Sequence, residues 1–162
     1  MFRQFKFEEP LYQKLDQIPV STQFKLEGIG SNFPFGAWNQ LPLEERWVLC
    51  HLGIRTKGER ECYSQYLAYV LRRQGIASVS PGTAGPAPEK KAWEDLSRLP
   101  SEVAQKMRDL NLPLFWPEWI KLDDIERYTL FKLCRDNSAD AQIQQVVQEF
   151  LGLSNPSSVP IP

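Results

Sequence analysis

The sequence predicts an all-α protein built from two tandem, pseudo-symmetric four-helix repeats packed as one helical domain. The main observation is that the chain of 162 residues matches itself without a gap at an offset of 81, half its length. Nine of the 41 pairs between 12–52 and 93–133 are identical, where typical residue frequencies would give roughly two or three. The matched positions are mainly apolar or aromatic and lie three or four apart, as a shared helical packing scheme requires.

The first three helices of each copy follow from local signals. The first is expected to end at an Ile-Pro or Leu-Pro step, because the residue before proline avoids helical geometry. The second is expected to stop near Gly30 or Asn111, and the third is apolar on more than one side, which places it at the centre of its unit. The expected ranges are 10–17, 20–29 and 42–53 in the first copy, and 89–98, 101–111 and 122–135 in the second.

The fourth helix of each copy is predicted from its start and its buried face. Thr56–Glu59 and Asn137–Asp140 resemble capping boxes, with a side-chain acceptor three residues before an acid. Apolar residues then follow with the spacing i, i+4, i+7, i+8. The predicted buried residues are Cys62, Tyr66, Tyr69 and Val70 in the first copy, and Ile143, Val147, Phe150 and Leu151 in the second.

The segments outside the helices complete the predicted organisation. Phenylalanines alternate with polar residues over 1–9, which suggests a short extended arm. Proline and glycine concentrate between the copies and proline and serine at the end of the chain, which predicts a linker and a disordered tail. The expected parts are residues 1–76 (first repeat with its arm), 77–88 (linker), 89–153 (second repeat) and 154–162 (tail).

Composition excludes several classes of function. Nineteen basic against twenty acidic residues leave a net charge of −1, without the basic face that nucleic-acid or membrane-surface binding needs. No apolar run is long enough to span a bilayer, and the charged start lacks a signal peptide, so we expect a cytoplasmic protein. Three widely spaced cysteines predict neither a disulfide framework nor a zinc site.

No catalytic or metal-binding constellation stands out. His51 is the only histidine, its counterpart in the second copy is Lys132, and a general base needs a second group nearby. Cys50 and Cys62 pair with apolar residues of the other copy, which predicts core positions for both. The sequence has no phosphate loop, serine elbow or metal-ligand cluster. We therefore expect a protein that is not an enzyme and needs no cofactor.

Two sets of residues are candidates for binding. Four basic residues recur at matched positions: Lys25, Arg46, Lys106 and Arg127. They either fix the docking of helices through buried contacts or form an anion site. Aromatic residues in the proline-bearing loops are candidates for partner contacts: Phe35, Trp38, Trp116 and Trp119. Trp38 and Trp119 match each other and favour the core, whereas Phe35 and Trp116 are better candidates for exposed rings.

Several short motifs occur in an order that resembles a known family. They are Phe5-Lys-Phe-Glu8, Ile18-Pro19, Phe24-Lys-Leu-Glu27 with Gly28-Ile29, Trp38, Glu45-Arg46 and Tyr66. This stretch, about residues 5–75, resembles the cyanobacterial nitrate reductase associated proteins. The resemblance implies an accessory or maturation protein for assimilatory nitrate reductase, a molybdenum-cofactor, iron–sulfur enzyme that takes electrons from ferredoxin. It implies no catalytic residues.

Three functional hypotheses stay open at this point. In the first, the chain binds nitrate reductase as a maturation factor, during insertion of the molybdenum cofactor. In the second, it is a stable subunit that helps ferredoxin to dock and deliver electrons, for which only scattered basic residues offer a surface: Arg55, Lys57, Arg60, Arg72 and Arg73. In the third, it carries molybdopterin on the four matched basic residues.

Overall fold

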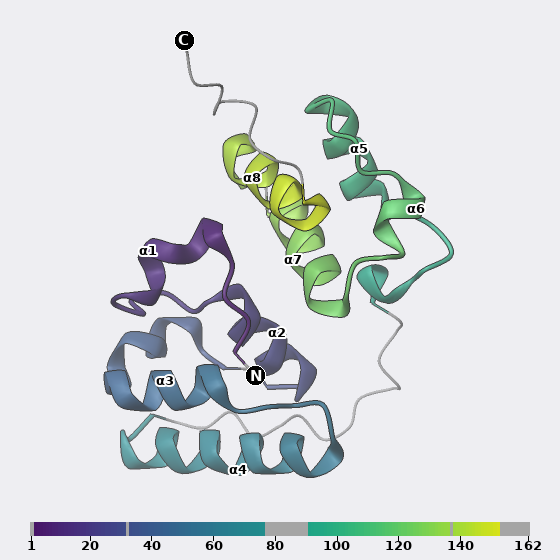
Figure 1. Ribbon diagram of the computed structural model, residues 1–162. Helices are drawn as coiled ribbons and strands as arrows, with labels where there is room; N and C mark the ends of the chain where they lie inside the picture. Colours follow the sequence, from purple (N-terminus) through teal and green to yellow (C-terminus); the bar gives the residue numbers. More distant parts are fainter. Residues whose placement is uncertain (1, 32, 77–90, 137, 153–162) are drawn as a thin grey trace. The chain divides into compact units, whose positions relative to one another are not determined.

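The computed structural model describes residues 2–31, 33–76, 91–136 and 138–152. These residues form helices and loops only, with no strand among them, so the all-α prediction is confirmed (Figure 1). The chain divides into two compact units, Met1–Pro88 and Glu89–Pro162, and each is described by itself. The predicted linker and tail lie outside the described residues. In the described part, no helix is both long enough and apolar enough to cross a membrane.

Each unit contributes four α-helices to the described part of the chain. The N-terminal unit contains the 3-10 helices η1 (Lys6–Glu8) and η2 (Phe35–Gln40) and the α-helices α1 (Glu9–Tyr12), α2 (Val20–Gly28), α3 (Leu43–His51) and α4 (Lys57–Arg73). The C-terminal unit contains the 3-10 helix η3 (Ala92–Glu94) and the α-helices α5 (Ser101–Asp109), α6 (Trp116–Trp119), α7 (Asp124–Arg135) and α8 (Asp140–Leu151).

The second predicted helix of each copy corresponds to α2 and α5, and the predicted stop signals are confirmed. Both helices begin directly after a proline, Pro19 or Pro100. Past their ends, Gly30 and Asn111 adopt left-handed backbone geometry, with φ values of 68° and 51°. Glycine and asparagine tolerate this geometry best, which is why they terminate helices.

The first predicted helix of each copy is much shorter than expected. Instead of 10–17 and 89–98, the structure has only α1 and the three residues of η3. In the N-terminal unit, Leu15 turns into the left-handed region with φ 47°, which no α-helix can contain. The predicted extended arm is also wrong over Lys6–Glu8, where η1 forms and Phe5 lies buried beside it.

In the N-terminal unit, α3 and α4 lie side by side and bury apolar residues between them and α2 (Figure 1). The buried residues of α4 are Tyr63, Leu67, Val70 and Leu71. They keep the predicted spacing but start one residue later than expected, so Cys62 and Tyr69 are exposed and Tyr66 is half-buried. The observed register buries two leucines and one phenol group, where the predicted one buries a thiol and two phenol groups; the gain in apolar burial outweighs the cost of the Tyr63 hydroxyl, which has no partner in the described part of the chain.

In the C-terminal unit, α7 is the central helix, with α5 and α8 both packed against it. The buried residues of α8 are Ile143, Val146 and Val147, while Phe150 and Leu151 are only half-buried. The helix α8 begins at Asp140 with Ala139 as its N-cap, and Asn137, the N-cap predicted from the sequence, lies outside the described residues. A full capping box occurs at the start of α7, between Asp123 and Glu126.

Candidate binding surface

Lys25 is a buried lysine held by a backbone carbonyl. Its side chain is only 5% exposed, and Nζ donates a hydrogen bond of 2.5 Å to the Cys50 carbonyl at the end of α3. Burial lowers the pKa of Lys25 to about 8, because an ammonium group loses its hydration inside the unit. This side chain therefore ties α2 to α3.

The two matched arginines also bind backbone carbonyls within their own units. Arg46 donates to Leu41 O at 2.9 Å and to Leu15 O at 2.8 Å. Arg127 is 6% exposed and donates to the carbonyls of Trp93, at 3.2 Å, and of Leu122. In both units the guanidinium thus joins the start of the central helix to the segment that precedes the second helix.

Lys106 differs from its counterpart Lys25, because it forms an ion pair of 2.7 Å with Asp140 near the surface. The structure brings Lys25 and Arg46 into one unit and Lys106 and Arg127 into the other, each side chain with its own partner. These contacts favour the first interpretation of the four basic residues, in which they fix how the helices dock.

Trp38 and Trp119 are core residues of their units, with exposed fractions of 1% and 0%. Trp38 Nε1 donates to the Leu15 carbonyl at 2.7 Å, whereas Trp119 Nε1 is buried without a partner in the described part of the chain. Neither ring is available to a partner at the surface of its unit, so only the core interpretation of this pair remains. Phe35 lies in η2, and the structure does not describe its side chain.

Trp116 lies at the centre of an exposed apolar surface in the C-terminal unit. Its side chain is 47% exposed, and Nε1 donates a hydrogen bond of 2.9 Å to the Leu96 carbonyl. Ile120 lies one helical turn further on, and Phe115 directly precedes the helix. Leu96, Phe115, Trp116 and Ile120 are all among the large apolar residues that the structure exposes. We call Leu96, Phe115, Trp116 and Ile120 the Trp116 surface.

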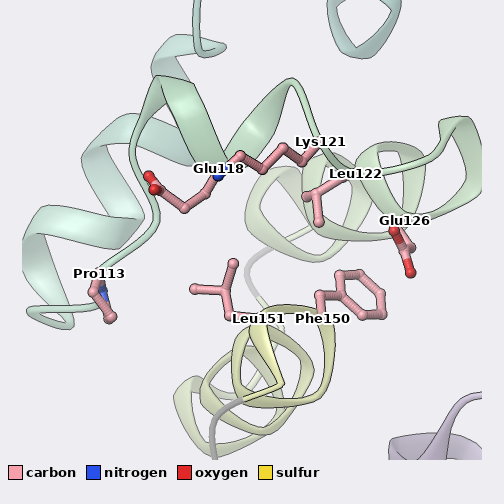
Figure 2. A pocket seen from close by; sticks show the side chains of 7 residues that line it. All are labelled: Pro113, Glu118, Lys121, Leu122, Glu126, Phe150 and Leu151. Carbon is pink, nitrogen blue, oxygen red and sulfur yellow. The ribbon is translucent and has the colours of Figure 1, made fainter.

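The same unit contains a pocket between the end of α8 and the segment that joins α6 to α7 (Figure 2). Its volume is about 400 Å³. Apolar side chains and three charged ones line it: Pro113, Leu122, Phe150 and Leu151 with Glu118, Lys121 and Glu126. Sequence reasoning missed this pocket, because its walls come from segments about thirty residues apart. The one available signal was that Phe150 and Leu151 end an apolar face.

Two glutamates of the pocket are held by backbone N–H groups at helix starts. Glu118 accepts from Phe115 N at 3.2 Å, and Glu126 accepts from Asp123 N at 3.0 Å. In return, Asp123 accepts from the Glu126 N–H at 2.9 Å, which closes a capping box. Both glutamates therefore have a fixed orientation before any partner arrives.

The groups considered for catalysis have unremarkable surroundings. His51 is exposed, with Nδ1 2.8 Å from the Trp47 carbonyl and its ring tilted against Phe2. Burial raises the pKa of Cys50 to about 11 and that of Cys134 to about 12, so both thiols stay protonated at neutral pH. Cys62 is exposed, and its predicted core position is wrong. Among the described residues, no three His, Cys, Asp or Glu side chains form a metal-binding group.

Exposed aromatic side chains and a pocket in one helical unit are features of binding proteins. Comparison with protein-family models then identifies the family. Residues 4–150 match the conserved nitrate reductase-associated protein family, and the chain belongs to it. The resemblance noted in the first half of the sequence is thereby confirmed, and the match extends through α7 and most of α8. Searches of curated proteins and of solved structures found no match.

Proposed function

We propose that this chain is a non-catalytic accessory protein that binds nitrate reductase and brings it to its active form, acting while the molybdenum cofactor is inserted. Membership of the nitrate reductase-associated family supports the partner. The Trp116 surface is the observation that carries the binding role, because four large exposed apolar residues of one unit lie in α6 or next to it, or in the segment bonded to Trp116.

Trp116 has the properties of a binding hot spot. Tryptophan is enriched among the few residues that dominate binding energies, and truncating such a residue costs about 2 kcal/mol or more. The hydrogen bond to Leu96 O orients the indole in the free protein. Less conformational freedom is then lost when a partner covers the ring.

The contacts of the basic residues support this role over the two alternatives. A molybdopterin carrier would need free cations, whereas Lys25, Arg46 and Arg127 donate to carbonyls of their own units. Ferredoxin docking would need a concentrated basic patch. On α4, Lys57 pairs with Glu61 and Arg73 with Glu45, which reduces the positive field of that helix.

We also propose that the two units are copies of one ancestral unit, as the offset of 81 predicts. Equivalent backbone hydrogen bonds support this. Ser31 N donates to Leu26 O, and Leu112 N donates to Met107 O; Leu41 N donates to Trp38 O, and Leu122 N donates to Trp119 O. Experimental coordinates in which the two units do not superpose at this offset would refute the duplication.

One backbone carbonyl that is equivalent in the two units accepts from a different tryptophan in each unit. This difference bears on the binding role. Leu15 O accepts from the buried Trp38, whereas Leu96 O accepts from the exposed Trp116. In the C-terminal unit the equivalent carbonyl thus accepts a hydrogen bond from a tryptophan at the surface. This supports the assignment of partner binding to that unit.

Deletion of the gene separates the maturation role from electron delivery. Nitrate reductase would be purified from cells with and without this protein, and its molybdenum content and its activities with an artificial donor and with ferredoxin would be measured. We expect enzyme from the deletion strain to have a low molybdenum content and low activity with both donors. Full molybdenum with a loss of ferredoxin activity alone would favour the electron-delivery alternative. Full molybdenum and full activity with both donors would refute any accessory role.

The binding surface is tested by Trp116→Ala in the full chain, with affinity for purified nitrate reductase measured by titration. A loss of about 2 kcal/mol corresponds to about 30-fold weaker binding. Tyr69→Ala is the matched control, because Tyr69 is the exposed aromatic residue of α4 in the other unit. Circular dichroism spectra would verify that both variants fold. Equal affinities for the two variants would rule out the Trp116 surface as the binding site.

A further inference from the structure

We propose that the pocket of the C-terminal unit receives a segment of nitrate reductase in which an apolar side chain is flanked by a lysine or arginine. This inference rests on the proposed function and adds the chemistry of the partner's segment. The apolar side chain would fill the floor of the pocket, and the basic group would pair with one of the two carboxylates at its sides, Glu118 or Glu126.

The floor of the pocket suits an apolar side chain. Phe150 and Leu151 project from the end of α8 toward Leu122, with Pro113 at one side (Figure 2). Phe150 and Leu151 are both half-buried, so they still expose apolar surface to water. Covering that surface releases about 25 cal/mol for each Å² removed from water. The volume of about 400 Å³ falls in the range of pockets that bind compact groups.

The charged residues around the pocket determine which sign of charge a partner segment should carry. Residues 118–126 contain four carboxylates and one lysine, although the whole chain is nearly neutral with a charge of −1. Asp124 is paired with the buried Arg127, so the charges that line the pocket are those of Glu118 and Glu126 against Lys121, two negative and one positive, a net of −1. A negative rim attracts a cationic segment and repels an acidic one, which gives specificity as well as faster association.

The two pocket glutamates are prepared for such a pairing. Backbone N–H groups of Phe115 and Asp123 hold their carboxylates, so little side-chain entropy is lost when a basic group binds. A charge-assisted hydrogen bond from a lysine or arginine is about twice as strong as a neutral one.

The pocket and the Trp116 surface share the short helix α6 and the residues next to it. Glu118 lies two residues after Trp116 within α6, and Lys121 directly follows Ile120. Residues two apart on a helix point to opposite sides, so a partner that covers Trp116 and also enters the pocket must reach around α6.

The test uses charge substitutions of opposite sign in the full chain. In Glu118→Gln/Glu126→Gln both side chains keep an acceptor oxygen, so the contacts at the helix starts survive while the charges are lost. Binding to purified nitrate reductase should weaken about 10-fold at about 50 mM salt, and the difference should shrink at about 0.5 M, because salt screens charges near the surface. Lys121→Gln should strengthen binding about twofold, since it removes the one positive charge that lines the pocket.

Two further variants complete the design. Leu151→Gln should weaken binding about fivefold with little change in the salt dependence, because it makes the floor polar. Asp109→Asn is the matched control: Asp109 is an exposed carboxylate of α5 outside the pocket, and asparagine keeps the acceptor for Gln105. It should leave the affinity unchanged.

The outcomes separate this inference from the proposed function. If wild-type protein does not bind nitrate reductase, the proposed function fails and the pocket assignment fails with it. If wild type binds and Trp116→Ala weakens binding, but the charge variants change neither affinity nor salt dependence, only the pocket assignment is overturned. Weaker binding by Lys121→Gln would point to an acidic segment and also overturn it. If sedimentation shows that the double glutamine variant changes self-association instead, the pocket holds a second copy of the chain and the assignment is wrong.

Discussion

Replacing Arg127 by methionine tests whether this arginine holds the C-terminal unit together. The side chain is 6% exposed and donates to two backbone carbonyls, those of Trp93 and Leu122. Methionine keeps the apolar stem but leaves both carbonyls without their donor. Each unsatisfied buried acceptor costs about 1–3 kcal/mol, and part of the sum is offset because the variant no longer has a guanidinium to strip of its hydration on folding. The third partner, Asp124, is 72% exposed and regains water at little cost.

We therefore expect Arg127→Met to lower the free energy of unfolding of this unit by about 3 kcal/mol, a large share of the 5–15 kcal/mol typical of a domain. Urea unfolding followed by far-ultraviolet circular dichroism would measure the change. The control is Arg135→Met on the same helix, where the side chain is 54% exposed and the expected change is within about 0.5 kcal/mol. A loss below about 1 kcal/mol for Arg127→Met would refute the argument from unsatisfied carbonyls.

Three further predictions follow from the described contacts. Native protein should expose one reactive thiol to Ellman's reagent, that of Cys62, and all three should react in urea; fast reaction of a second thiol in native protein would contradict the observed burial. The pKa of Lys25 is about 8 in the folded protein and 10.5 in the unfolded protein. As the pH rises, the folded protein therefore loses the ammonium proton of Lys25 at a lower pH than the unfolded protein does. Lys25 therefore costs stability below pH 8, and the cost disappears as the pH rises to 10.5. Relative to Lys25→Met, wild type should gain up to about 3 kcal/mol over that interval in urea titrations; a flat difference would exclude the lowered pKa. Asn111→Ala and Gly30→Ala should each cost about 1 kcal/mol in thermal unfolding, and Asn111→Gly should not, because only the alanines strain a left-handed backbone.

Local signals predicted the helices well where the chain chemistry alone decides the geometry. The starts of α2 and α5 after proline, and the left-handed residues Gly30 and Asn111 beyond their ends, are set by backbone sterics within a few residues. The capping box of α4 is equally local, since Thr56 and Glu59 satisfy each other's backbone N–H groups.

Tertiary contacts determine which face of α4 is buried, because the sequence pattern fits two faces equally well. On α4, two registers one residue apart fit the same helical spacing, and only packing against α3 selects Tyr63 and Leu67 over Cys62 and Tyr66. Tyr66 instead donates its hydroxyl to Glu45, a contact between two helices that no single-helix pattern contains.

The candidate site was partly accessible from sequence. Trp116 was a candidate for an exposed ring, because it lies in a proline-bearing segment and its counterpart, Phe35, is a candidate too; in the structure the Trp116 side chain is 47% exposed. The pocket of the same unit was not accessible, because Glu118 and Phe150 are brought together only when α8 folds back on α7.

The bond from Trp116 to the Leu96 carbonyl has a mechanical consequence. Leu96 lies in the segment between η3 and Pro100, the N-cap of α5, and α5 packs against α7. A force applied to the indole is transmitted along this route into the helices of the unit. Pulling a partner away from this ring thus loads the folded core, whereas the same pull on a freely rotating surface side chain would only reorient it.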